Sequence, residues 1–395
     1  MTYKILDEKS AVQYMVDNLG YFDNSADLTC REIGDGNLNH VFRIVDRATK
    51  KSLILKQALP YARTSKEMAL DASRCKIEAM TLMEQRKYAP EMVPKVLHYD
   101  NDLYALVMED LADHIILRAG MMQQKKYPNL AKDAANYFAN SLIRTSDIVL
   151  ESKYKKDQVL RFINKDLCDL TEKLVLTSPT YNDPRKRVAP FLQNFERDEI
   201  INNQDVVAAF AKLKHKFMTS AQALLHGDAH TGSIFVTEES TKFFDTEFGF
   251  YGPMGFDTGL FVGNLMMNAV YQKVKGFDEY YDWVKNTIEE FIDQFTDQFN
   301  AMWDRYAVEH YAKNSAAFKS TYLGQVLEDT AGYCACEMIR RTTGSSHVAE
   351  MDEYSDNTQH EQAQKTNIII AKEILLNQTS FTRGSDYKAC LEQIL

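Results

Sequence analysis

The first third of the chain alternates short apolar runs with polar turns, which is the pattern of β-strands. Five such runs are predicted as strands: Leu28–Ile33, Val41–Val45, Leu53–Ala58, Val96–Tyr99 and Leu103–Met108. Apolar residues at helical spacing mark Ala11–Asn18 before the first strand and Asp71–Arg86 before the fourth. We therefore expect a small antiparallel sheet accompanied by two helices.

After Leu111 the spacing of apolar residues becomes helical. The predicted helices are Ala131–Val149, Asp205–Leu224, Thr258–Tyr271, Trp283–Tyr306 and Thr321–Arg341. A hairpin is expected between them, where Ser233–Val236 and Lys242–Phe244 form two short apolar runs. The pattern predicts an α+β protein of two lobes. Residues 1–111 would form an N-lobe around the sheet, and residues 112–395 a larger, mainly helical C-lobe.

The net charge of the chain limits the classes of partner that it is expected to bind. Of its 395 residues 45% are hydrophobic and 26% charged, and the net charge is -10. Lys and Arg form no long basic run, so the surface would repel nucleic-acid phosphates and anionic lipids. We expect neither nucleic acid nor a membrane as a partner.

The amino terminus lacks the apolar stretch of a secretory signal. The most apolar later segment, Gly259–Val270, contains Asn264 and Asn268 and is shorter than the ~20 residues that span a bilayer. Six scattered cysteines form no CxxC pair, which favours reduced thiols over a zinc site. A soluble, cytoplasmic protein is expected.

Two features of the predicted sheet suggest a phosphate site. Gly34 and Gly36 lie in a turn where glycines leave backbone N–H groups open to phosphate, although an ordinary hairpin turn has the same pattern. Lys56 falls at an inward position of an apolar strand, where a charge needs a partner. Glu78 on the next helix offers one, as in the lysine–glutamate pair of kinases. The alternative is an edge-strand lysine whose ammonium group lies in water.

The strongest chemical signal is His226–Ser233, followed after the hairpin by Phe244–Phe248. Phosphoryl transfer needs a carboxylate that orients the attacking hydroxyl and further carboxylates that hold Mg²⁺. Asp228 and Asp245 occupy the positions of these two acids in kinases. The kinase metal-binding asparagine is replaced by Ser233, so we expect Glu247 to supply the missing oxygen ligand to Mg²⁺. The alternative is a set of ordinary surface acids.

Two further positions have more than one interpretation. Asp257 lies in a turn that feeds a helix, where it would cap the helix and support the catalytic loop. Arg340 and Arg341 lie near the end of a long helix, before Gly344 as a C-cap. They would either complement the helix dipole or bind an anion.

Together these motifs resemble the 5-methylthioribose kinase family. The matching segments are Glu32–Asn39, Lys56–Tyr61, Val107–Leu111, His226–Ser233, Asp245–Phe248 and Ile339–Thr342, and the resemblance covers nearly the whole chain. It implies the two-lobed protein-kinase-like fold of the aminoglycoside-phosphotransferase and choline-kinase branch. It also implies ATP-dependent phosphorylation of the anomeric hydroxyl of methylthioribose, a step of methionine salvage, by a homodimer.

The resemblance assigns roles by position. Asp228 would be the catalytic base and contact the substrate. Asp245 and Glu247 would hold Mg²⁺, and Arg340 and Arg341 would reach the sugar and the transferring phosphoryl group. The residues expected to bind ATP are Gly34, Gly36, Asn39, Lys56, Glu78 and, as the hinge whose backbone meets adenine, Glu109, Asp110 and Leu111.

The chain departs from the family at Ser65–Leu70, where the family carries a tryptophan-containing stretch, and at Ala229 and Thr246. We expect the altered loop to affect closure over the substrate more than the choice of acceptor. One alternative function is another sugar or amino-alcohol kinase of the branch, acting on choline or an aminoglycoside. The arginine pair favours an oxygen-rich acceptor over these cations. A non-catalytic nucleotide sensor would lack one of Lys56, Asp228 or Asp245, and all three are present.

Overall fold

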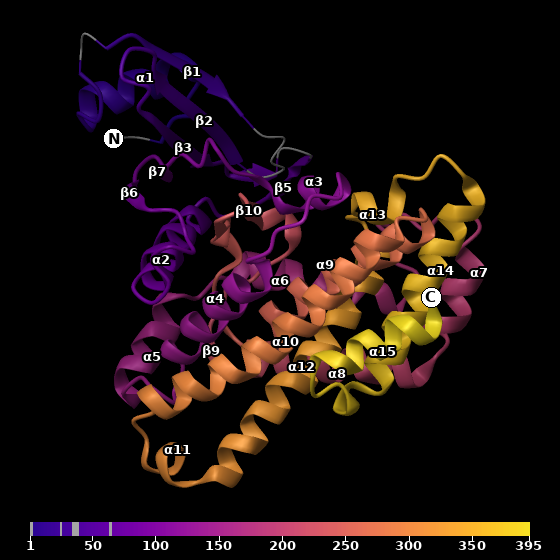
Figure 1. Cartoon of the computed structure of the whole chain (residues 1–395). Helices are drawn as coiled ribbons and strands as arrows, with labels where there is room; N and C mark the ends of the chain where they lie inside the picture. The colour runs from indigo at the N-terminus through magenta and orange to yellow at the C-terminus, as the bar shows by residue number, and fades with distance from the viewer. Residues whose placement is uncertain (1–2, 24–25, 34–38, 63–64) are drawn as a thin grey trace.

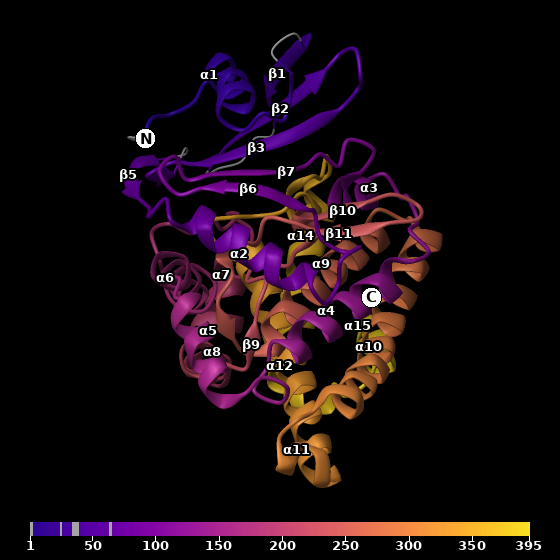
Figure 2. The same cartoon turned by 90° about the vertical axis from the view of Figure 1, so that its left-hand side faces the viewer.

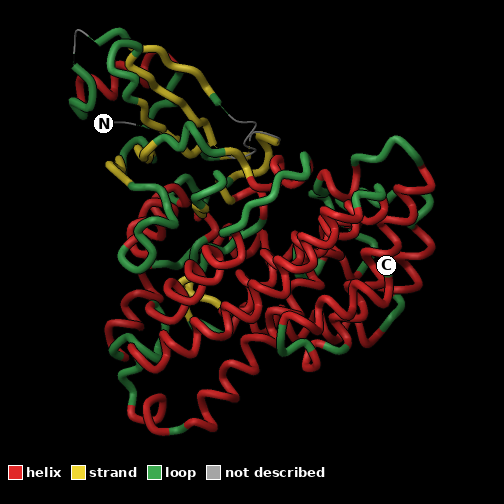
Figure 3. Tube along the Cα trace, viewed as in Figure 1, coloured by secondary structure: helices red, strands yellow, loops and turns green. Residues whose placement is uncertain are grey.

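The computed structural model describes residues 3–23, 26–33, 39–62 and 65–395 (Figure 1). Strands gather in the amino-terminal part, and helices make up most of the rest (Figure 3). This is the two-lobed α+β arrangement that the apolar pattern predicts. The boundary between lobes at residues 111 and 112 stays a prediction, although the last strand of the large sheet ends at Glu109.

The amino-terminal sheet has five antiparallel strands in the order β1-β2-β3-β7-β6. Their bounds are Leu28–Glu32 (β1), Asn39–Asp46 (β2), Ser52–Ala58 (β3), Val96–Asp100 (β6) and Ala105–Glu109 (β7). A small hairpin of β4 (Tyr61–Ala62) and β5 (Ser65–Ala69) follows β3. All five strands predicted from the sequence are present, with ends shifted by one or two residues.

The two faces of this sheet pack against different helices, because successive side chains of a strand point to opposite faces. In β7, Ala105 and Val107 pack with the helix α1 (Glu8–Gln13), which continues as a π-helix over Tyr14–Asn18. Leu106 and Met108 pack on the other face with the helix α2 (Arg74–Arg86). Figure 2 shows α2 beneath the sheet, next to the helical part. The face toward α2 therefore looks toward the junction of the two parts.

The helical part is built around long helices whose apolar faces form one core. Its longer helices are α4 (Leu130–Arg144), α5 (Ser152–Arg161), α6 (Lys165–Leu174), α8 (Gln204–Thr219), α9 (Met254–Val274), α10 (Asp278–Tyr306), α12 (Ala316–Thr343), α14 (Asn357–Leu376) and α15 (Gly384–Ile394). Shorter ones are α3 (Leu117–Met122), α7 (Gln193–Glu196), α11 (His310–Asn314) and α13 (Ala349–Asp352). No helix in the described ranges combines the length and apolar character that a membrane span requires.

Short strands within the helical part hold two loops. The predicted hairpin is present as β10 (Ile234–Val236) and β11 (Thr241–Phe243), and β8 (Ile115–Ile116) pairs with its other edge. A separate pair joins β9 (Ala223–Leu224) to β12 (Tyr251–Gly252). Residues 225–233 and 244–250 are thus held at both ends by strand pairing.

Two predicted helices end earlier than their apolar pattern suggested. The prediction of one helix over Asp205–Leu224 was wrong at its end, because α8 stops at Thr219 and Ala223–Leu224 pairs as β9. Helix α4 stops at Arg144, and the Thr145 hydroxyl accepts a hydrogen bond from the Leu224 backbone N–H at 3.0 Å. Periodicity does not separate these segments, since a buried strand and a buried helix end are both apolar.

Candidate active site

The loop that carries Asp228 packs directly against the loop that carries Asp245. Gly227 has φ +84°, and a Cβ atom there would lie 2.1 Å from the backbone oxygen of Phe248. Only glycine combines this positive φ with so close an approach. The contact fixes the position of Asp228, the next residue, relative to the second acidic loop.

The carboxylate of Asp257 supports the same loop. It accepts hydrogen bonds from the backbone N–H of His226 at 2.6 Å and of Gly227 at 2.9 Å. Burial raises the pKa of Asp257 to about 7. The supporting role expected from the sequence therefore has a structural basis. The capping role was wrong, because α9 begins at Met254 and Asp257 lies inside its first turn.

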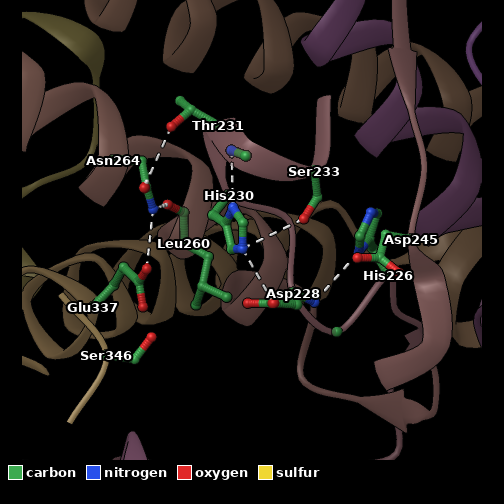
Figure 4. Close-up of polar contacts among 12 residues, drawn as sticks. His226, Asp228, His230, Thr231, Ser233, Asp245, Leu260, Asn264, Glu337 and Ser346 are labelled. Carbon is green, nitrogen blue, oxygen red and sulfur yellow. Dashed lines mark hydrogen bonds and ion pairs between the residues drawn. The ribbon is translucent and has the colours of Figure 1, made fainter. Parts of the chain in front are cut away.

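Cationic and polar groups surround the carboxylate of Asp228, whose side chain is 25% exposed. Figure 4 shows one of them, His230, next to Asp228. One oxygen lies 3.2 Å from Nε2 of His230. The other lies 3.6 Å from Nη2 of Arg340 and 4.0 Å from Nη2 of Arg341. Burial by itself would raise the pKa of Asp228, but His230 and the two arginines hold it well below its usual range. The carboxylate is therefore ionised at neutral pH.

The two histidines of the loop are neutral, and their partners define their tautomers. His226 donates from Nε2 to the backbone oxygen of Phe244 at 2.8 Å, and its Nδ1 accepts from the Asp228 N–H. Burial lowers its pKa to about 4. In His230, Nδ1 accepts from the Gly232 N–H at 2.9 Å, which leaves an Nε2–H to face Asp228. Burial also lowers the pKa of His230.

Glu337 holds the arginine pair in place. Nε of Arg341 donates to its carboxylate at 2.8 Å, and Nε of Arg340 also donates to it. Although burial would raise the pKa of Glu337, the two arginines lower it to about 2. The three residues share one face of α12, and Gly344 ends this helix by donating its N–H to the Arg340 oxygen. The guanidinium groups thus point toward Asp228 and not along the helix axis.

Lys56 connects the sheet to the helical part. Its Nζ lies 2.9 and 2.8 Å from the two carboxylate oxygens of Glu78 on α2, and it also pairs with Asp245. Burial by itself would lower the pKa of Lys56, but Asp245 and Glu78 raise it well above its usual value. The lysine–glutamate pair predicted from the sequence is present. The edge-strand alternative was wrong, because Lys56 is buried.

Glu247 is buried among partners from the amino-terminal part. Nδ2 of Asn39 donates to its carboxylate at 3.0 Å, and Nε of Arg74 donates at 3.1 Å. Arg74 also donates from Nη2 to the Asn39 side-chain oxygen at 3.0 Å. Asn39, which we expected at ATP, is therefore bonded to Glu247 in this structure.

The residues beside Lys56 fit a divalent cation. Glu78, Asp245 and Glu247 are three acids that face two cationic groups, Lys56 and Arg74. Burial raises the pKa of Glu247, and the negative charge of Asp245 raises it further. A bound cation would therefore relieve the repulsion between these two carboxylates. No group of three potential ligands is close enough to hold a metal alone within the described residues. Mg²⁺ usually takes one or two carboxylates together with substrate phosphates and water, which agrees with this donor set.

Asp245 is the more accessible of the two predicted metal ligands. It adopts the left-handed conformation with φ +65°, and its side chain is 39% exposed. Ser233 lies near His230, with its hydroxyl 3.5 Å from Nε2. That Asp245 binds the metal, and that Ser233 does not, stay predictions.

The predicted hinge leads from the last strand of the sheet to the helical part. Glu109 accepts from the Lys95 N–H at 3.0 Å, and Asp110 accepts from Nε of Arg43 at 2.6 Å. Both carboxylates therefore have protein partners, and the role of residues 109–111 as a nucleotide hinge stays a prediction. Gly34 and Gly36 lie outside the described residues. The segment 65–70, expected as a loop, consists largely of β5, whose backbone pairs with β4.

Several site residues were missed from the sequence. Glu337 had a signal, since residues three and four apart on a helix share a face with the arginine pair. His230 lay inside the recognised motif without being assigned a role. Arg74, Arg118 and Asn264 had no signal, because only folding brings them to the site.

Similarities to known proteins extend along most of the chain. Residues 29–308 match the model of a phosphotransferase enzyme family. The chain is 37% identical over 394 residues to the methylthioribose kinase of Bacillus pumilus (strain SAFR-032), covering 99% of this chain and 98% of that one. It is 37% identical over 392 residues to the methylthioribose kinase of Geobacillus sp. (strain WCH70), covering 99% and 96%. Among solved structures, a choline kinase from Cryptosporidium parvum Iowa II aligns with a TM-score of 0.48 and 10% identity over 98% of this chain and 95% of that one.

Proposed function

Because the chain belongs to the methylthioribose kinase family and to the wider phosphotransferase enzyme family, it is a small-molecule kinase, and we propose that it transfers the γ-phosphoryl group of ATP to the anomeric hydroxyl of 5-methylthioribose. The observation that carries the proposal is the position of Asp228. It faces an arginine pair at 3.6 and 4.0 Å and lies on a loop packed against Asp245. Acceptor activation and phosphate chemistry would thus meet at one point.

Asp228 would orient the anomeric hydroxyl and accept its proton. As the hydroxyl oxygen forms a bond to the γ-phosphorus, the bond from phosphorus to the ADP oxygen breaks. The phosphoryl group carries negative charge on its oxygens during the transfer. Arg340 and Arg341 would offset that charge, since planar guanidinium groups match phosphoryl oxygens better than an ammonium group.

Lys56 would hold the ATP phosphates, aided by Glu78, and the backbone of residues 109–111 would meet adenine. Asp245 and Glu247 would both hold Mg²⁺. When bound, Mg²⁺ supplies positive charge that keeps the phosphates in position. We also propose that Gly34, Gly36 and Asn39 contact ATP once Asn39 is released from Glu247.

Family expectation supports three further proposals: a homodimer, a cytoplasmic location and a role in methionine salvage. It also supports a lobe boundary after residue 111. Light scattering on the purified protein tests the dimer.

A screen of ADP release against methylthioribose, ribose, choline and an aminoglycoside tests the function. We expect methylthioribose to give the highest kcat/KM. Faster turnover of choline or an aminoglycoside would refute the proposed acceptor while leaving the kinase assignment intact.

A further inference from the structure

A third arginine, Arg118, lies beside the arginine pair. It belongs to α3, follows the strand β8, and its side chain is 18% exposed. Nη2 donates to the side-chain oxygen of Asn264 on α9 at 2.6 Å. Nε lies 3.4 Å from a carboxylate oxygen of Glu350 on α13. The protein therefore holds the guanidinium group by a hydrogen bond at Nη2 and by an ion pair, without a hydrogen bond, at Nε.

Asn264 ties Arg118 to the proposed acceptor site. Its side-chain oxygen also lies 3.5 Å from the hydroxyl of Thr231, in the loop after Asp228. Its Nδ2 donates at 3.0 Å to Glu337, the carboxylate that holds the other two arginines. Figure 4 shows Asn264 between Thr231 and Glu337. The link is rigid because each of these groups is buried.

The remaining nitrogen of Arg118 points toward the catalytic loop. A Cβ atom on Gly232 would lie 2.9 Å from Nη1, and it would lie 2.6 Å from the ring of His230, the histidine that faces Asp228. Nη1 donates to no described residue. It is thus a charged donor without a partner, beside the residue that would activate the acceptor.

The positive and negative side chains around Arg118 and Asp228 are equal in number. Three guanidinium groups (Arg118, Arg340 and Arg341) accompany three carboxylates (Asp228, Glu337 and Glu350) in the described part of the site. A balanced site suits an uncharged acceptor with several hydroxyl groups better than a cationic or anionic one. Because Glu350 already offsets its charge, Arg118 suits a neutral hydroxyl better than a phosphoryl oxygen.

We propose that Arg118 is a substrate-binding residue that donates from Nη1 to a ring hydroxyl of the sugar acceptor, other than the hydroxyl that is phosphorylated. This inference rests on the proposed function. It gives the acceptor site a specificity contact, since a charged donor left without its hydroxyl partner penalises acceptors that lack that hydroxyl.

The test compares methylthioribose with its 2-deoxy and 3-deoxy analogues on the wild type and on Arg118→Met. On the wild type, loss of the recognised hydroxyl should lower kcat/KM by about tenfold or more, as expected for a charge-assisted hydrogen bond. Arg118→Met should lose a similar factor on methylthioribose and then show no further loss on that analogue. The KM for ATP should stay within about twofold, since the described partners of Arg118, Asn264 and Glu350, are not residues proposed to bind ATP. Equal sensitivity of wild type and variant to both analogues would overturn the proposal.

Arg144→Met is the matched control, because Arg144 lies between the rings of Tyr88 and Tyr306, at 4.7 and 4.1 Å, away from the acceptor site. It should lower the melting temperature and leave the response to the analogues unchanged. If Arg118→Met fails to fold, Arg118→Ala replaces it, because alanine also lacks a donor, and unchanged sensitivity to both analogues would again overturn the proposal.

The outcomes for the two proposals are separable. If the wild type turns over another acceptor instead of methylthioribose, the proposed function fails. The same comparison, with hydroxyl-deleted analogues of that acceptor, then still decides the role of Arg118.

Discussion

Asp228 combines low basicity with a fixed position. Its neighbours stabilise the carboxylate form, which weakens it as a base but guarantees that it is ionised when the acceptor arrives. In a loose phosphoryl-transfer transition state the attacking hydroxyl loses its proton late, so orientation matters more than base strength. His230 and the arginine pair provide that orientation.

We predict that Asp228→Asn lowers kcat by ~10²–10⁴-fold, the usual contribution of a positioned base. Binding of Mg-ATP should stay nearly unchanged, because the nucleotide side is built from Lys56, Glu78 and Asp245. Single-turnover rates and nucleotide titrations on the purified variant measure both quantities. Activity within a few-fold of the wild type would remove Asp228 from the mechanism.

Glu247 has both a structural and a proposed metal role, which its buried contacts with Asn39 and Arg74 connect. Glu247→Gln should raise the Mg²⁺ concentration that gives half-maximal rate. Adding Ser233→Asn should recover part of the affinity by restoring an amide oxygen ligand.

Glu247→Gln also loses an ion pair with Arg74, so its melting temperature is measured alongside. A stability loss with unchanged magnesium dependence would show a purely structural role for Glu247.

At the scale of elements, α12 delivers a pair of arginines from one helical face. Residues three and four positions apart lie side by side on a helix, so Glu337 reaches both Arg340 and Arg341. The helix is buried along most of its length, which keeps this face pointed at the catalytic loop.

Arg340→Ala and Arg341→Ala should each lower kcat more than they raise the KM for the acceptor. The reason is that the charge they offset appears mainly in the transition state. Steady-state kinetics with saturating ATP separate the two effects. A rise in KM at constant kcat would mean that the arginines only bind the ground state.

The contact between the two acidic loops also belongs to this scale. Gly227→Ala should destabilise the protein by more than ~1 kcal/mol, the usual cost of alanine in place of a glycine with positive φ. It should also abolish activity, because the added methyl group would push the Asp228 loop away from Phe248.

Gly276→Ala is the control, since Gly276 has φ +80° and nothing within 4 Å of an added Cβ. It should show the backbone cost alone and full activity. Chemical denaturation and the ADP-release assay compare the two variants. Equal losses in both would refute the role of the close contact.

For the whole molecule, Lys56 joins three parts: the strand β3, the helix α2 and the second acidic loop. Lys56→Met should therefore lower stability and remove the rise in melting temperature that Mg-ATP produces. Thermal melts with and without nucleotide measure both effects.

Lys155→Met is a fair comparison, because Lys155 is also buried and donates to the backbone oxygens of Ala221 and Gln222, which are not residues proposed to bind nucleotide. It should be destabilised while keeping the nucleotide response. A full response in Lys56→Met would exclude Lys56 from phosphate binding.

Local pattern was enough to predict the strands of the large sheet, five of the long helices and the loops that carry Asp228 and Asp245, although the helices α5, α6, α14 and α15 were not predicted. Alternation and helical spacing are set by the backbone geometry of each element, so they appear in the sequence itself. Lys56 with Glu78 was also predictable, since a charge in an apolar strand demands a partner.

Other features depended on contacts between distant segments. Asn39 with Glu247 and Arg118 with Asn264 are separated by more than a hundred residues, and no local pattern records such a pair. The end of α8 was set by strand pairing of Ala223–Leu224 with Tyr251–Gly252. The sequence by itself thus determined the elements and the chemical type of the site. Only the tertiary structure decided which polar groups meet there, because the orientation of buried hydrogen bonds and charges depends on neighbours that folding supplies.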